Sequence, residues 1–172
     1  MKTSVILFIL ALLPFTLFAQ EHKHSHARNE IGISPGASYS PSHKSWGFGI
    51  HAHYFRTLGI HSPWSLGGSL EQVSLHGTHW TIGAGAKYQF IDRLSVAVMP
   101  GITFFGHKEE EHDHASHESN DKHNNSPKFS THFELVYDLI HLEHIHFGPT
   151  IDYSWSKHDA HFMFGIHCAY GF

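Results

Sequence analysis

The sequence predicts an all-β protein, an eight-stranded antiparallel up-and-down transmembrane β-barrel. Three observations lead to this prediction. Hydrophobic residues alternate with small or polar residues at a period of two along most of the chain. The face opposite the apolar one carries Gly, Ser, Thr and His, with few of the charges that a solvated surface needs. An apolar segment at the N-terminus has the form of a secretory signal peptide.

The composition fits one compact domain. The 172 residues are 41% hydrophobic and 15% charged, which excludes a disordered tail protein and a multidomain enzyme. With 11 Lys and Arg against 15 Asp and Glu, no basic surface is available and no nucleic-acid partner is expected. The single Cys168 can build neither an internal disulfide nor a cysteine-rich metal site. The unusual feature is the 21 histidines, which outnumber all Lys and Arg together.

The first predicted element is a signal peptide over residues 1–19. Lys2 precedes an apolar run that is interrupted by Pro14 and ends before the polar Gln20. A transmembrane anchor is the alternative, but this run of about 14 residues is shorter than the roughly 20 that a spanning helix needs. Cleavage would leave a His-rich periplasmic arm over residues 20–27 at the start of the mature chain.

Eight strands are predicted over the rest of the chain, each with one apolar face. They cover residues 30–39, 46–54, 64–73, 79–90, 94–104, 129–139, 147–155 and 160–172. The alternation is clearest in the last strand and weakest in the third. Outer loops are predicted near 41–45, 74–78, 107–127 and 156–159, and inner turns near 58–63, 91–93 and 140–145. The one long loop therefore falls on the outer side, as in bacterial membrane barrels.

The two faces of the strands distinguish a membrane barrel from a soluble sandwich or lipocalin-like barrel. A soluble barrel buries its apolar face and shows charge outside. Here the second face is small and polar, with single charges such as Lys87, Glu134 and Asp152, which suits the interior of a narrow barrel. Aromatic residues near strand ends match the two interfacial girdles of such barrels: Trp46, Tyr54, Trp80, Tyr88, Phe90, Tyr153, Trp155 and Phe172.

With these strands and a final segment HFMFGIHCAYGF that ends in an aromatic residue, the chain resembles a known family. It is similar to the small eight-stranded outer-membrane β-barrels, of the kind seen in the OmpA transmembrane domain and OmpX-like proteins. The resemblance covers nearly all of residues 28–172 and implies a place in the bacterial outer membrane, in contact with its lipids. It also implies that the barrel-assembly machinery recognises the C-terminal strand through Tyr170 and Phe172. It does not specify an activity.

The loop between the fifth and sixth strands carries the strongest functional signal. Its segment HKEEEHDHASHESNDKHNNS, residues 107–126, holds five histidines and six acids against two lysines. Imidazole and carboxylate together suit Zn²⁺, Cu²⁺ or Ni²⁺. The predicted metal ligands are His107, His112, Asp113, His114, His117 and His123. Ordering such a loop costs entropy, so low affinity is expected, and the alternative is a solvated loop without an ion.

Other histidines form three further sets. Those of the arm are additional predicted metal ligands: His22, His24 and His26. Histidines at inner turns would form a periplasmic metal-handling rim, or else are independent polar turn residues: His61, His141, His144 and His146. An inward-facing set is predicted to hydrogen-bond together as a structural plug: His51, His53, His132, Glu134, Asp138, His161 and His167.

The sequence therefore predicts a non-enzymatic outer-membrane barrel that binds or buffers zinc, copper or nickel at the cell surface. Its partner would be a periplasmic or TonB-linked metal transporter, which the sequence does not identify. The main alternative is a structural or adhesive barrel. A lipid A-modifying enzyme is less favoured, because no H-E-x-x-H or G-x-S-x-G motif occurs and Ser116–Glu118 lies in a loop without a rigid scaffold. Protonation of histidine near neutral pH would compete with metal binding.

Overall fold

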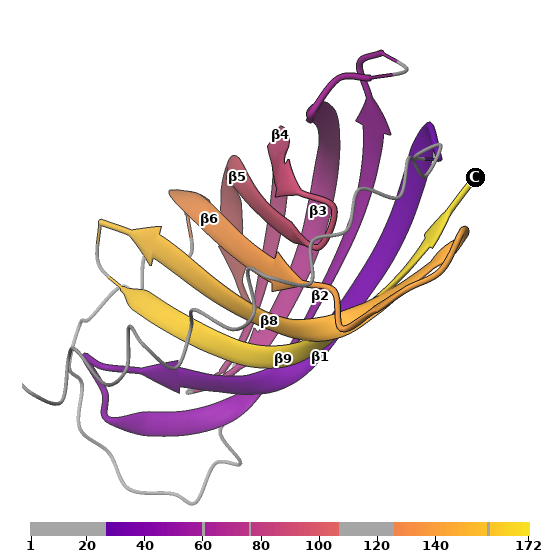
Figure 1. Ribbon diagram of the computed structural model, residues 1–172. Helices are drawn as coiled ribbons and strands as arrows, with labels where there is room; N and C mark the ends of the chain where they lie inside the picture. Colours follow the sequence, from indigo (N-terminus) through magenta and orange to yellow (C-terminus); the bar gives the residue numbers. More distant parts are fainter. Residues whose placement is uncertain (1–26, 60, 76, 107–125, 158) are drawn as a thin grey trace, which may run out of the picture.

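The computed structural model describes residues 27–59, 61–75, 77–106, 126–157 and 159–172, and these residues form a β-sheet (Figure 1). Each of the eight predicted strands has a counterpart in it. The elements are β1 (Asn29–Ser40), β2 (Ser45–Thr57), β3 (Trp64–Ser74), β4 (Thr78–Ile91), β5 (Leu94–Phe105), β6 (Lys128–Tyr137), the two-residue β7 (Ile140–His141), β8 (Ile145–Ser156) and β9 (Ala160–Gly171).

The sheet closes into an antiparallel barrel of eight long strands. Neighbouring strands pair in the order β6-β5-β4-β3-β2-β1-β9-β8, and β6 also pairs with β8. This last pairing runs from Ser130 opposite Ser156 to Val136 opposite Thr150. Closure leaves no long strand with a free hydrogen-bonding edge, which is how up-and-down barrels satisfy their backbone. The predicted fold class is confirmed.

The barrel has two different ends. Both described ends of the chain lie at one of them, where the backbone N–H of Asn29 donates to the carbonyl of Phe172 at 2.8 Å. We call this the terminal end; it lies at the upper right in Figure 1, where the C-terminus is marked. It carries the connections from β2 to β3, from β4 to β5 and from β6 to β8. The opposite end, where β5 ends and β6 begins, is called the loop end.

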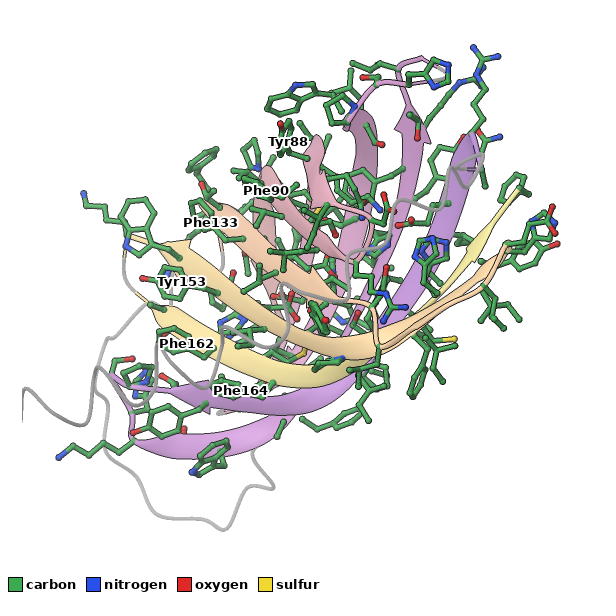
Figure 2. All side chains as sticks on the ribbon, in the orientation of Figure 1. Tyr88, Phe90, Phe133, Tyr153, Phe162 and Phe164 are labelled. Atoms are coloured by element: carbon green, nitrogen blue, oxygen red, sulfur yellow. The ribbon has the colours of Figure 1, made fainter. Side chains whose placement is uncertain are left out.

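The barrel is polar inside and apolar outside. Among the described residues, 20 buried positions are polar or charged and seven are hydrophobic. Large apolar side chains face outward from every long strand, and Figure 2 shows Phe162 and Phe164 of β9 beside Tyr153 of β8 on the outer side. The rings of Tyr153 and Phe162 have centroids 4.8 Å apart. The predicted direction of the two faces is therefore confirmed.

The structure differs from the sequence prediction between β6 and β8. The predicted strand 129–139 ends at Tyr137, and the predicted turn 140–145 contains β7. The Leu142 N–H donates to the Ile145 carbonyl at 2.8 Å, which closes a tight hairpin and lets β7 pair with β8. This hairpin lies at the terminal end (Figure 1). No helix in the described part of the chain is long and apolar enough to cross a membrane.

Candidate metal centre in the barrel lumen

The metal ligands that the sequence predicts in the loop and the arm lie outside the described residues, so their role stays a prediction. They are His22, His24, His26, His107, His112, Asp113, His114, His117 and His123. The predicted signal peptide, residues 1–19, lies there too and stays a prediction. The structure instead defines where the inward-facing set lies.

All seven members of the predicted inward set are buried. They come from β2, β6, the segment after β6, and β9: His51, His53, His132, Glu134, Asp138, His161 and His167. Asp152 of β8 is also buried, as its place on the polar face predicts. Two carboxylates that this set omitted join them, Glu30 of β1 and Glu71 of β3. The alternation of the strands could have identified them. Glu71, for example, lies on the same face of β3 as Ser65 and Val73, both of which are buried.

These ten residues, which we call the luminal column, are connected by contacts along the barrel axis. At the terminal end, Asp138 Oδ1 lies 3.8 Å from His167 Nδ1. The His167 ring stacks on the ring of His53, with centroids 5.2 Å apart. His53 Nε2 lies 3.3 Å from Glu30 Oε1. One imidazole thus links β9 to β2, and the next links β2 to β1.

The middle of the luminal column is organised by Glu134. Its Oε2 lies 3.5 Å from His53 Nδ1 and its Oε1 lies 3.3 Å from His51 Nδ1. The rings of His51 and His132 follow, with centroids 4.4 Å apart. A single carboxylate of β6 therefore joins two imidazoles that lie two residues apart on the same face of β2.

The column continues toward the loop end through two more carboxylates. His132 contacts Glu71 Oε2 through Nδ1 at 2.7 Å and Asp152 Oδ1 through Nε2 at 3.3 Å. The other oxygen of Glu71, Oε1, lies 3.1 Å from His161 Nε2, within hydrogen-bond distance. The contacts run without interruption from Asp138 to His161, the second residue of β9, near the loop end.

Negative charge dominates this lumen. Five carboxylates face one buried ammonium, that of Lys87, which contacts Glu30. With neutral histidines the formal balance is −4, and buried charges are costly unless they are compensated. Several buried polar atoms also have no hydrogen-bond partner among the described residues, including both ring nitrogens of His51 and both carboxylate oxygens of Asp152. The lumen therefore requires positive charge, from protonated imidazoles or from bound cations.

A group of three ligands lies at the terminal end of the luminal column. We call Asp138, His141 and His146 the mouth cluster; their ligand atoms lie within 4.8 Å of one another. Asp138 Oδ2 is 3.6 Å from His141 Nδ1 and 3.3 Å from His146 Nδ1. Ligand atoms around a tetrahedral Zn²⁺ are about 3.4 Å apart, given bonds of about 2.0–2.1 Å. The β7–β8 hairpin creates this spacing, because it pairs His141 directly with His146.

The carboxylate of the mouth cluster is ionised at neutral pH. Burial alone would raise the pKa of Asp138, which lies beyond the end of β6. The imidazoles of His141, His146 and His167 close to this carboxylate outweigh burial and hold the pKa of Asp138 well below its usual range. The side chains of His141, His146 and Asp138 are 6%, 13% and 7% exposed, so the site combines an anionic ligand with two imidazoles largely shielded from water.

Three further groups of ligands lie deeper in the luminal column. In each, one atom from every residue lies within 4.8 Å of the other two. The groups are Glu30–His53–His167, His51–His53–Glu134 and His51–His132–Asp152. Neutral imidazole with carboxylate is a donor set for Zn²⁺, Cu²⁺ or Ni²⁺. The luminal column, which contains the predicted plug, therefore holds the donors of several metal sites.

Comparison with known proteins identifies the fold. No family model matches the chain, and no curated protein matches its sequence. A structure of Ail, the attachment invasion locus protein of Yersinia pestis, has a TM-score of 0.55 and 13% identity over 86% of this chain and 99% of that chain. The chain has the fold of the small eight-stranded outer-membrane β-barrels. The family resemblance expected from the sequence is thus confirmed at the level of the fold.

Two other structures agree. A de novo designed transmembrane β-barrel has a TM-score of 0.53 and 11% identity, over 87% of this chain and 99% of that chain. Ail in complex with the heparin analogue sucrose octasulfate has a TM-score of 0.52 and 12% identity, over 86% of this chain and 99% of that chain. At such identities the likeness concerns the fold, and function has to be argued from the side chains.

Proposed function

We propose that this protein is a non-enzymatic barrel of the bacterial outer membrane that binds divalent transition-metal ions. The apolar, aromatic-rich outer face and the fold support the membrane location. The mouth cluster is the observation that carries the metal function. It combines one ionised carboxylate and two largely buried imidazoles at the spacing of metal ligands, at the terminal end of the luminal column.

The histidine-rich segments extend this proposal. Segment 107–126 connects β5 to β6 at the loop end, and residues 20–27 precede β1 at the terminal end. Their imidazoles and carboxylates would collect ions on either side of the membrane with low affinity. A periplasmic or TonB-linked transporter would then take the ion from the terminal end.

The membrane location predicts strong quenching of tryptophan fluorescence by brominated lipids. Trp46, Trp64, Trp80 and Trp155 have outward-facing side chains that are 40–65% exposed, so acyl chains would contact them. The measurement compares the chain refolded in vesicles of brominated and of ordinary lipid. Equal fluorescence in both, from a chain that has folded, would contradict insertion.

The metal function predicts that the double variant His141→Ala/His146→Ala disrupts one Zn²⁺ site. The affinity of the mouth cluster for Zn²⁺ should fall by more than about tenfold. Calorimetric titration of the full refolded barrel with Zn²⁺ and Cu²⁺ at pH 7.5 measures this loss. His144→Ala is the matched control, because His144 lies on the same hairpin but its Nδ1 faces the Gly171 carbonyl at 2.9 Å, outside the cluster. The control should bind as the unmodified chain does.

The same titration at pH 5.5 is a further check. Transition metals bind the unprotonated imidazole, so acid competes with the ion and should abolish binding. Binding that is unchanged in the double variant would refute the mouth cluster as a site. No binding of any ion by the unmodified chain would favour the structural or adhesive alternative, of which Ail, by its name an attachment protein, is an example.

The loop ligands have their own test. The triple variant His112→Ala/His114→Ala/His117→Ala should lose low-affinity Zn²⁺ binding and leave the mouth site intact. Calorimetry separates the two classes of site by affinity. A triple variant that binds as many ions as the unmodified chain would show that the loop takes no part in metal binding.

A further inference from the structure

We infer that the lumen holds a second metal centre, a pair of divalent transition-metal ions bridged by the imidazole of His51. This inference rests on the proposed metal binding but concerns residues other than the mouth cluster. His51 is fully buried in the middle of the luminal column. It belongs to two of the three-ligand groups, one with His53 and Glu134 and one with His132 and Asp152. An imidazole has two nitrogens, so it can serve one ion on each side.

The first ion would lie between β2 and β6. Glu134 Oε1 is 3.3 Å from His51 Nδ1, and Glu134 Oε2 is 3.5 Å from His53 Nδ1. Both separations are close to the roughly 3.4 Å between neighbouring ligands of a tetrahedral ion. Although these atoms lie close together, their angles do not allow hydrogen bonds, and His51 Nδ1, His53 Nδ1 and Glu134 Oε1 have no hydrogen-bond partner among the described residues. An ion at this point would satisfy all three atoms at once.

The second ion would use the other nitrogen of the bridge. The rings of His51 and His132 are 4.4 Å apart between centroids, and His132 Nε2 is 3.3 Å from Asp152 Oδ1. His51 Nε2 is also without a hydrogen bond. On the far side of His132, Nδ1 contacts Glu71 Oε2 at 2.7 Å. A carboxylate at the second nitrogen of a histidine is how proteins orient a metal-binding imidazole and raise its basicity.

Charge balance supports two ions rather than one. Three carboxylates surround the two groups, those of Glu71, Glu134 and Asp152. When both nitrogens of His51 bind metal, the ring loses its N–H proton to solvent and becomes an imidazolate with one negative charge. Two divalent ions then neutralise three carboxylates and one imidazolate. The step transfers a proton and no electrons, and it needs no other reactant.

The third luminal group is a poorer cation site. Glu30, His53 and His167 form it, but the Lys87 ammonium contacts Glu30 and already compensates its charge. A cation placed there would be repelled by the ammonium. The pair of ions therefore belongs on the side of His53 that faces Glu134.

The test counts ions in the full-length barrel with isosteric variants. Each refolded protein is loaded with Zn²⁺, dialysed, and analysed for zinc per folded barrel by mass spectrometry. The matched control is His161→Gln, because His161 is a luminal histidine that contacts Glu71 but belongs to none of the three-ligand groups. Relative to this control, His51→Gln should lose two ions, and Glu134→Gln and Asp152→Asn should lose one ion each.

A second measurement detects the bridge itself. The Cu²⁺-loaded control should show a spin-coupled pair by electron paramagnetic resonance, and His51→Gln should not. His141→Ala/His146→Ala should keep the coupled pair, which separates this centre from the mouth cluster. Equal zinc content in His51→Gln and His161→Gln would overturn the luminal centre, whatever the mouth cluster binds. A loss of one ion without coupling would overturn the bridge. If His51→Gln does not fold, the single losses in Glu134→Gln and Asp152→Asn decide the question.

Discussion

Replacing Lys87 by methionine is expected to lower the free energy of unfolding of the metal-free barrel by about 3–5 kcal/mol. Lys87 is the one buried Lys or Arg among the described residues, and its ammonium contacts Glu30 Oε1. The side chains are only 11% and 15% exposed, so water compensates little of the lost pairing. Without Lys87, Glu30 keeps its contact with His53 Nε2 but loses its ammonium partner, in a lumen with four other carboxylates. Urea titration in lipid vesicles with chelator, followed by tryptophan fluorescence, measures the change.

Two variants make this expectation specific. Lys87→Met/Glu30→Gln removes the pair together and should recover most of the lost stability, since neither charge is then left alone. Lys157→Met changes the same residue type at an exposed position and should alter stability by less than about 0.5 kcal/mol. The electrostatic argument fails if Lys87→Met costs no more than Lys157→Met.

Replacing Gly67 by alanine is expected to destabilise the barrel by about 3 kcal/mol or more, or to prevent its folding. A Cβ at this position of β3 would lie 1.9 Å from the backbone carbonyl oxygen of Tyr54 on β2. A backbone atom of a paired strand cannot move aside without breaking the ladder, so β2 and β3 would have to separate. Urea titration, with heat-dependent electrophoretic migration as the sign of a closed barrel, measures the effect.

The adjacent glycine is the matched control for this change. A Cβ at Gly68 would lie 3.1 Å from the Gly83 carbonyl oxygen, a contact that a shift of a few tenths of an ångström relieves. Gly68→Ala has the same effect on the unfolded chain, so that contribution cancels between the two variants. We expect it to cost less than about 1 kcal/mol. Equal effects of the two substitutions would mean that close strand approach at Gly67 does not limit the fold.

The strands and the direction of their faces were predictable because they depend on local information. A period of two places alternate side chains on opposite faces, and short connections place consecutive strands side by side. Even the weakest predicted strand, 64–73, corresponds to β3. The largest discrepancy is the β7–β8 hairpin, where Leu139 continues the apolar alternation and conceals the break after Tyr137. That break creates the mouth cluster, which the sequence suggested only as a rim of turn histidines.

The sequence by itself determined that this chain forms a barrel with an apolar exterior and a histidine-rich interior, because each residue's face follows from its parity along a strand. Only the tertiary structure decided which imidazoles meet which carboxylates. His51, His132 and Asp152 come from β2, β6 and β8, and Glu71 meets His161 across 90 residues of chain. Such contacts cross the lumen, so they depend on the tilt and stagger at which the closed sheet places each strand. Neither the tilt nor the stagger can be predicted from the alternation of residues in a single strand.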